Sequence, residues 1–376
     1  EGLLLPSPWD GRFQFAHDRV QEAALALIPA EEHAAVQVQI ARSLIQSSSG
    51  AWGERLFSVV DRVNDAEAAI TDADERMRFA ELDLRAGRVA LLSNAHRVAS
   101  EYFEAGLRFL PEDGWTSAHQ LTLDLHDGAA RAALLALDYE AVDRFGRSID
   151  AHCPDPLERV ERWVVQIESL SGRGRLAEAL AVGRVALDAL GLCLPARVSS
   201  GRRWWNRLQS RWQLRALTPA RMGELPPMED PRELAIARIG EALVVPLFQA
   251  GPVHLGDLLH ALLPRILAHG CPPSGPFVLA SWAAVVAARD DIGQGEALGV
   301  AAVHLGSRES YRSARARAEL VFNITLGWRD RPLREVATTV WSAVDGMLAA
   351  GDPTYVALTV AHGLVLRLLS GAHLQR

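Results

Sequence analysis

The spacing of apolar residues constrains this chain more than any other feature, because it repeats with a helical period along almost the whole length. Residues 34–45 and 76–92 carry apolar side chains at positions i, i+3, i+4 and i+7. Alanine, leucine, arginine and glutamate, which favour helices, dominate the composition. Strand-like alternation is confined to a short segment near Arg12, where Phe13 and Phe15 alternate with polar neighbours. The sequence therefore predicts an all-α fold with one short strand near its start.

Turn residues divide the helical pattern into pairs of helices. Glycine, proline and aspartate interrupt it at intervals of about 15 to 20 residues, which is typical of helix hairpins. A tetratricopeptide unit of about 34 residues needs small residues where its helices touch, an aromatic ring beside them and a proline after the second helix. Residues 80–113 fit this pattern. The matching residues are Gly87, Ala99, Phe103, Gly106 and Pro111.

Later stretches fit the same pattern less strictly and at irregular spacing. Small and aromatic residues recur at Ala141 and Phe145, and small residues recur again at Ala179 and Ala186. A single hairpin cannot bury its apolar face alone, so neighbouring hairpins must stack into a continuous core. We therefore expect a degenerate, tetratricopeptide-like α-solenoid.

The 376-residue chain contains no lysine, so all of its basic residues are arginine. A P-loop needs a lysine on the nucleotide phosphates, a protein kinase needs one on its third strand, and Schiff-base chemistry needs an amine. These enzyme classes are excluded within these residues. The net charge of -7 provides no general attraction to nucleic acid or anionic lipid. We expect no catalytic residue and no cofactor in this segment.

Cysteine, histidine and serine do not form a recognised site in the sequence. Cys153, Cys193 and Cys271 are far apart and form no CxxC pair, which favours reduced thiols in a cytoplasm over a metal or disulfide framework. The histidines lack metal-ligand spacing, and no serine lies in a GxSxG turn. The longest apolar runs are too short to span a bilayer, and no signal peptide is visible. These observations predict a cytoplasmic chain without a metal site.

An arginine- and tryptophan-rich segment interrupts the helical array at residues 197–230. Trp204 and Trp212 share one face of a predicted helix, and Arg203 and Arg207 lie beside them. Such a patch can bind nucleic acid or a membrane surface. It can equally pack as an amphipathic helix on the array with its arginines in solvent. We favour the second interpretation, so neither nucleic acid nor membrane is an expected partner.

Several segments resemble a single protein family and follow the order in which they occur in that family. They are FQFAHDRVQEAALALIP, LFSVVDRVN, AELDLRAGRVA, YFEAGLRFLPEDGW, LPPMEDP and WRDRPLRE, which begin at residues 13, 56, 80, 102, 225 and 328. Each segment alone has low specificity, but together they cover nearly the whole chain. The chain is similar to the helical region that follows the ATPase module of large bacterial predicted ATPases of the STAND signalling type.

The resemblance implies a division of the chain and a set of neighbouring domains. Residues 1–50 would end the winged-helix element of the ATPase module, 51–196 and 231–376 would form two blocks of repeats, and 197–230 would link them. A serine/threonine kinase domain often precedes such a module, and a GAF domain with a sensor histidine kinase often follows. ATP or ADP with Mg²⁺ would bind in the upstream AAA-type ATPase. The chain would then be a fragment at both ends.

The motif His17-Asp18-Arg19 is the candidate for nucleotide contact. In related switch ATPases a winged-helix histidine approaches the nucleotide phosphates, and His17 occupies the matching position in the motif. The chemistry would be a charge-assisted hydrogen bond to phosphate. The alternative is a structural His-Asp pair that caps a helix.

The expected partners follow from the repeat architecture. Repeat arrays bind peptides or partner domains on their concave face, and contacts in cis to the upstream ATPase and a downstream output domain would couple the array to signalling. We therefore predict a non-catalytic sensor and scaffold segment. Two alternatives remain open, namely the helical region of a LuxR-type ATP-dependent transcriptional regulator and a free-standing protein-binding adaptor.

Overall fold

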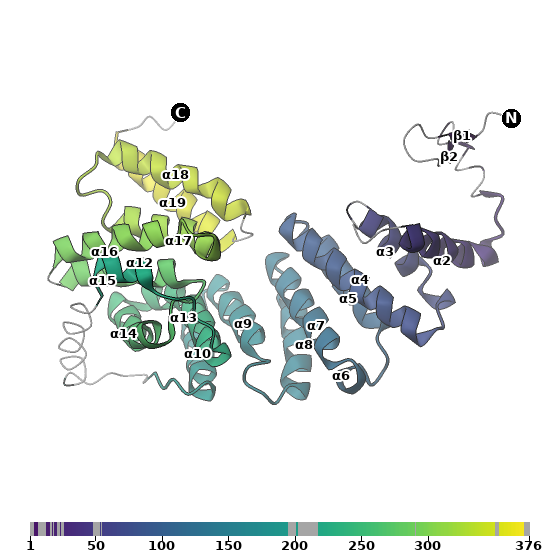
Figure 1. Cartoon of the computed structure of the whole chain (residues 1–376), viewed down its shortest axis with the longest axis horizontal. Coiled ribbons are helices and arrows are strands. Elements are labelled where there is room, and N and C mark those ends of the chain that lie inside the picture. The colour runs from purple at the N-terminus through teal and green to yellow at the C-terminus, as the bar shows by residue number, and fades with distance from the viewer. Residues whose placement is uncertain are drawn as a thin grey trace. The chain divides into compact units, whose positions relative to one another are not determined.

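In the part of the chain that the structure describes, all elements are helices apart from one short strand pair, as the apolar spacing predicts (Figure 1). The computed structural model describes residues 4–6, 13–15, 17, 19–20, 23, 26–47, 53, 55–194, 201, 217–289, 291–349 and 353–371. Among these residues, no helix combines the length and the apolar character needed to cross a bilayer.

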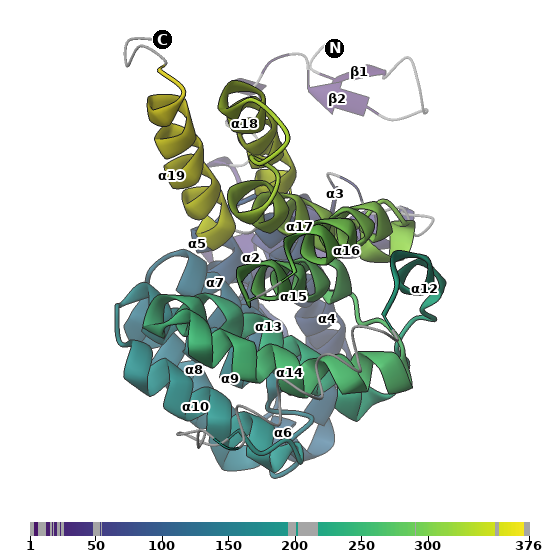
Figure 2. The ribbon, with the colours of Figure 1, turned by 90° about the vertical axis from the view of Figure 1, so that its left-hand side faces the viewer.

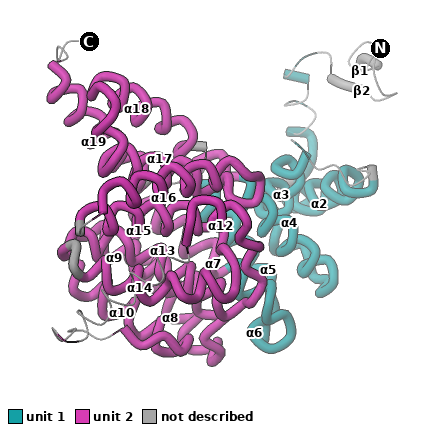
Figure 3. Tube along the Cα trace, turned by 60° about the vertical axis from the view of Figure 1, so that its left-hand side comes forward, with its two compact units in different colours: residues 1–89, 98–125 teal, residues 90–97, 126–376 magenta. Residues whose placement is uncertain are grey.

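The chain divides into two compact units, which Figure 3 shows in different colours. Unit 1 comprises residues 1–89 and 98–125, and unit 2 comprises residues 90–97 and 126–376. The division after residue 125 falls inside the block that the resemblance assigns to one set of repeats. Each unit is described separately below.

Unit 1 begins with a strand that pairs with the predicted one. Strands β1 (Leu4–Pro6) and β2 (Phe13–Phe15) are antiparallel, with Leu4 opposite Phe15. The helices of unit 1 follow. They are α2 (Ala30–Ser47), α3 (Arg55–Asp65), η1 (Glu67–Ala69), α4 (Ala73–Leu92), α5 (His96–Phe109), α6 (Gly114–Ser117) and the first part of α7 (His119–Leu135). Helix α3 is strongly amphipathic and buries Leu56, Val59, Val60 and Val63.

The described part of unit 2 is a series of helices, and those from Val160 onward pack around one apolar core. After the end of α7, its helices are α8 (Tyr139–His152), α9 (Val160–Gly172), α10 (Leu176–Ala189), α12 (Pro219–Glu224), α13 (Pro231–Ala250), α14 (Pro252–His269), α15 (Gly275–Arg289), α16 (Ile292–Leu305), η2 (Glu309–Tyr311), α17 (Arg312–Thr325), α18 (Leu333–Ala349) and α19 (Pro353–Leu369). Each helix packs on the next from α8 to α10 and from α13 to α19, and α12 packs on α16. Helix α13 also packs on α9 and α10, and α15 packs on α17 (Figure 2).

Acidic caps define the starts of several helices in unit 2. Asp230 accepts hydrogen bonds from the backbone N–H groups of Arg232 (2.8 Å) and Glu233 (3.2 Å), and Pro231 occupies the first helical position of α13. Asp291 caps α16 in a similar way, since its side chain accepts a hydrogen bond from Gln294 N–H at 2.9 Å. Such caps satisfy backbone donors that have no partner within the helix.

The described part of the expected linker belongs to the core of unit 2. Leu217, Met222, Leu225 and Met228 are all buried in it, and Met222 is completely inaccessible. Backbone hydrogen bonds also join Met228 N–H to the carbonyl of Cys271 at 2.9 Å. Four buried apolar side chains within 12 positions explain why this stretch packs into the core and does not act as an exposed linker between two blocks of repeats.

Candidate functional site

Unit 2 contains a cavity of about 850 Å³ whose wall comes from several helices that are not consecutive in the chain. The end of α7, then α9, α13, α17 and α19, supply nearly all of the lining. The polar lining residues are Arg131, Tyr139, Glu168, Ser171, Arg238, Glu241, Gln249, Arg317, Thr354 and Tyr355. The apolar ones include Leu134, Leu135, Leu137, Val245, Pro246 and Leu358. This volume lies within the range of ordinary ligand pockets.

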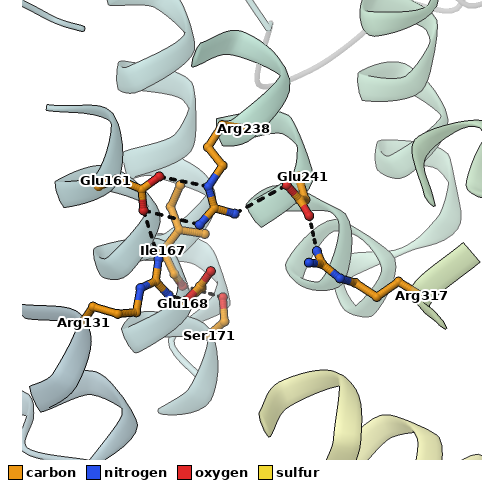
Figure 4. A network of polar contacts seen from close by, with 8 residues as sticks. All are labelled: Arg131, Glu161, Ile167, Glu168, Ser171, Arg238, Glu241 and Arg317. Carbon is orange, nitrogen blue, oxygen red and sulfur yellow. Dashed lines mark hydrogen bonds and ion pairs between the residues drawn. The ribbon is translucent and has the colours of Figure 1, made fainter. Parts of the chain in front are cut away.

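A chain of alternating arginines and glutamates follows this wall (Figure 4), and all of its members except Glu161 line the cavity. Arg131 of α7 donates to two carboxylates of α9, to Glu168 through one terminal nitrogen and to Glu161 through the other at 3.2 Å. Glu161 and Glu168 are seven positions apart in α9 and therefore lie on one side of the helix. The guanidinium of Arg131 thus ties α7 to two successive turns of α9.

The same chain continues from α9 to α13 and α17. Arg238 donates to Glu161 through Nε at 3.0 Å and through a terminal nitrogen at 3.3 Å, which is the two-pronged geometry that suits a guanidinium. Its other terminal nitrogen lies 3.4 Å from Glu241. Glu241 also accepts a hydrogen bond from Arg317 of α17. Six charges therefore alternate along a path from Glu168 to Arg317 and join four helices.

The mutual field of these groups favours the charged forms of Glu161, Arg131 and Arg238. Burial alone would raise the pKa of Glu161, but the charges and hydrogen bonds of Arg238 and Arg131 outweigh burial and hold this pKa below its ordinary value. Burial would likewise lower the pKa of Arg238 and of Arg131, yet Glu161 and Glu168 respectively raise them. An alternating chain of this kind stays charged without a net excess of either sign.

Two tyrosines add aromatic surface to the cavity. The guanidinium of Arg317 lies over the ring of Tyr355, 5.3 Å from its centroid, and Phe277 meets the same ring edge-on at 5.4 Å. On α8, the ring of Tyr139 lies 5.1 Å from the guanidinium carbon of Arg173. Both contacts are within the range of cation–π attraction. The rings are therefore held in place by the charges near them.

The chemistry of the wall suits a ligand with both acceptors and apolar groups. Each guanidinium on the wall carries N–H donors and each carboxylate carries acceptors, so the wall presents charged hydrogen-bonding groups of both kinds. The apolar side chains and the tyrosine rings offer contact area on the remaining wall. A peptide segment has this mixture of carbonyl acceptors and side chains, and an extended stretch of it fits a cavity of this size.

Unit 1 has a smaller hollow of about 450 Å³ between α2 and α4. Arg42 bridges it with a two-pronged pair to Glu75, both hydrogen bonds being 2.6 Å long. Arg78 and Arg85 lie on its rim and are exposed. Exposed pairs of this kind contribute little to stability and are common on solvated helix faces.

The residues predicted to pack the repeat lie at helix contacts. An added methyl group on Gly87 would be 2.6 Å from the Phe103 ring, and one on Gly106 would be 2.7 Å from Leu125. Ala99 is completely buried, as is Phe103, and Pro111 lies exposed just beyond α5. In unit 2, Ala141, Phe145, Ala179 and Ala186 are all buried.

The other predicted positions are exposed or lie outside the described residues. His17 and Arg19 are solvent-exposed, and the carbonyl of His17 accepts a hydrogen bond from Val20 N–H at 2.9 Å. Asp18 lies outside the described residues. So do the four residues of the arginine–tryptophan patch, Arg203, Trp204, Arg207 and Trp212.

The residues of the charged chain were not predicted from the sequence. One signal was present, since Arg131 and Arg238 interrupt runs of alanine, isoleucine and leucine that are otherwise buried. A charge within such a run indicates a partner, because an unpaired buried charge is costly. The partners themselves could not be identified, because Arg238 and Glu161 are 77 positions apart.

Compared with protein-family models, with curated proteins and with solved structures, the chain gives no match.

Proposed function

We propose that this chain is a non-catalytic binding segment of a cytoplasmic signalling ATPase, and that the cavity of unit 2 receives a peptide segment of a partner protein. The observation that carries this proposal is the cavity wall, where four helices that are not consecutive in the chain contribute one continuous chain of charges. A site assembled from many helices of one series is what a helical-repeat array would offer.

The finer assignment of the fold is part of the same proposal. The hairpins would form a tetratricopeptide-like α-solenoid, and β1 with β2 would be the remnant of a winged helix. The close approach of Phe103 to Gly87 supports the first assignment, because a small residue facing an aromatic ring is what the repeat pattern requires. The antiparallel pairing of β1 and β2 supports the second.

The mechanism would be a coupling between partner binding and the nucleotide state of the upstream ATPase. The charged chain joins α7, α9, α13 and α17, so a ligand that displaces one of its ion pairs would alter the contacts of several helices. Such coupling requires that the partner binds two states of the protein with different affinity.

Site-specific photo-crosslinking in the intact parent protein tests the binding site. A photoreactive phenylalanine at Leu137, which lines the cavity and is 68% exposed, is expected to capture a partner. The same residue at Val185, which is 64% exposed on α10, is the matched control. Arg238→Met should abolish capture at position 137. Capture at both positions alike, or none at 137, would count against the cavity as the site.

The Arg238→Met variant needs a control for lost ion pairing in general. Arg315→Met removes an exposed pair with Glu319 on α17, at 2.8 Å, and should leave capture unchanged. Coupling is tested separately by measuring ADP affinity of the parent with and without the captured partner. Binding that leaves ADP affinity unchanged would favour a simple adaptor over a nucleotide-coupled sensor.

A further inference from the structure

A buried carboxylic acid in unit 1 lies outside the cavities described above. Asp83 of α4 is 1% exposed and is surrounded by α3 and α5. One of its oxygens, Oδ1, accepts a hydrogen bond from Asn64 Nδ2 of α3 at 2.9 Å. The backbone of Gly106 on α5 approaches the other side closely, since a methyl group there would be 3.2 Å from Asp83 Cβ.

Two oxygens of this pair have no hydrogen-bond donor. They are Asp83 Oδ2 and Asn64 Oδ1, and both are buried. If Asp83 were ionised, two buried acceptors of adjacent side chains would remain unsatisfied, which is costly. A single proton on Asp83 Oδ2 removes this problem, because a neutral carboxyl group donates one hydrogen bond while it accepts another.

We propose that Asp83 is protonated at neutral pH and forms a closed pair with Asn64, in which Asn64 Nδ2–H donates to Asp83 Oδ1 and Asp83 Oδ2–H donates to Asn64 Oδ1. The pair joins α3 to α4 and makes their packing depend on a bound proton. Raising the pH removes this proton, leaves a buried negative charge and loosens unit 1. The chain thereby contains a proton-sensitive contact that is separate from the cavity of unit 2.

The surrounding charges are consistent with a neutral acid. Burial raises the pKa of Asp83 to about 8, and the hydrogen bond from Asn64 only partly opposes this effect. Arg108 lowers this pKa, whereas Asp61 and Glu67 raise it. Arg108 is itself paired with Glu67 at 2.9 Å. On α5, Tyr102 donates its hydroxyl hydrogen to Asp61 at 2.7 Å and therefore gives none to Asp83.

The sign of the pH effect follows from these pKa values. In the unfolded chain the Asp83 carboxyl has its ordinary pKa of 3.8, and in the folded chain its pKa is about 8. Between these values the folded state holds a proton that the unfolded state has lost, so stability falls as pH rises. The local opening constant of α3 and α4 should increase about tenfold per pH unit in this window and level off above it.

Carbon-13 NMR of the whole chain, labelled at aspartate carboxyl carbons, tests the protonation state directly. One aspartate is expected to titrate near pH 8, and its signal should be missing from Asp83→Asn. The titration is therefore detected in the unaltered chain, and the variant serves only to assign the signal to Asp83. If every aspartate titrates below pH 6, the proposal is overturned.

Hydrogen exchange measured by mass spectrometry tests the consequence for packing. Asparagine at position 83 can form the same two hydrogen bonds with Asn64 but does not titrate. Asp83→Asn should therefore make the local opening of α3 and α4 independent of pH between 5 and 8, once the exchange rates are corrected for the pH dependence of intrinsic exchange. Glu81→Gln removes an exposed charge from the same helix and is the control, which should keep the wild-type pH dependence. A pH dependence of Asp83→Asn equal to the wild type would refute the proton-sensitive contact.

Discussion

At the scale of single residues, the contact between Gly87 and Phe103 determines how closely α4 and α5 pack. A methyl group at position 87 would be 2.6 Å from Cε1 of the ring, closer than real carbon contacts allow. Both residues are buried, and Phe103 is 0% exposed, so the ring has no free space to enter. The small residue is therefore required by its neighbour and not by its own backbone angles.

Replacing Gly87 by alanine is expected to destabilise unit 1. The overpacking cost of about 1–3 kcal/mol exceeds the gain of about 1 kcal/mol that alanine brings to a helix interior. Hydrogen exchange of α4 and α5 peptides in urea would measure the difference. Gly346→Ala on α18 is the control, because its nearest neighbour is 3.8 Å away, and it should be neutral or stabilising. Equal effects of the two substitutions would contradict the packing argument.

At the scale of elements, the start of α13 depends on one side chain. The Asp230 side chain accepts hydrogen bonds from two backbone N–H groups of the first turn, which would otherwise lack a partner. Helix α13 supplies Arg238 and Glu241 to the charged chain, so its first turn fixes the beginning of a helix that the cavity depends on.

Replacing Asp230 by alanine should lower the stability of α13 by about 1 kcal/mol, the usual cost of a lost cap. The amide hydrogens of Arg232 and Glu233 would exchange faster, and this is measurable residue by residue by NMR. The adjacent Glu229→Ala removes a carboxylate that caps nothing and should leave both amides protected. Protection that is unchanged in Asp230→Ala would show that other contacts hold this turn.

At the scale of the whole molecule, the two units should unfold separately. Each has its own internal packing, and chains of more than one unit commonly depart from two-state unfolding. In increasing urea, pulse-labelled hydrogen exchange should resolve two transitions. Gly87→Ala is expected to shift only the unfolding transition of unit 1, and Arg238→Met only the unfolding transition of unit 2. A single transition that both variants shift equally would mean that the chain unfolds as one body.

Local signals in the sequence account for most of the fold. Helical spacing predicts the helices, Phe13 and Phe15 predict the strand at Phe13–Phe15, and an acid followed by proline at Asp230 marks a helix start. These features depend on neighbours a few positions away, so a single sequence contains them. The assignment of residues 217–228 to the core does not follow from such signals, because it depends on where α16 and Cys271 lie.

The candidate site could not be predicted from the sequence, because it too depends on residues that are distant in the chain. Glu241 meets Arg317 across 76 positions, and nothing local connects these two residues. The buried Asp83 is similar, since its environment comes from three helices. Periodicity could place both residues on a helix, but which side chains they meet depends on how distant helices pack.

The sharing of carboxylates along the cavity wall has an evolutionary consequence. Glu161 serves both Arg131 and Arg238, and Glu241 serves both Arg238 and Arg317, so the loss of either glutamate leaves two arginines without their shared partner. A substitution at one position leaves an excess charge in a partly buried wall, and a reversal of sign must spread to several helices before balance returns. Drift at this surface is therefore confined to changes that arise together, and descendants of this sequence should retain the chain of charges or lose its members in neighbouring arginine–glutamate pairs.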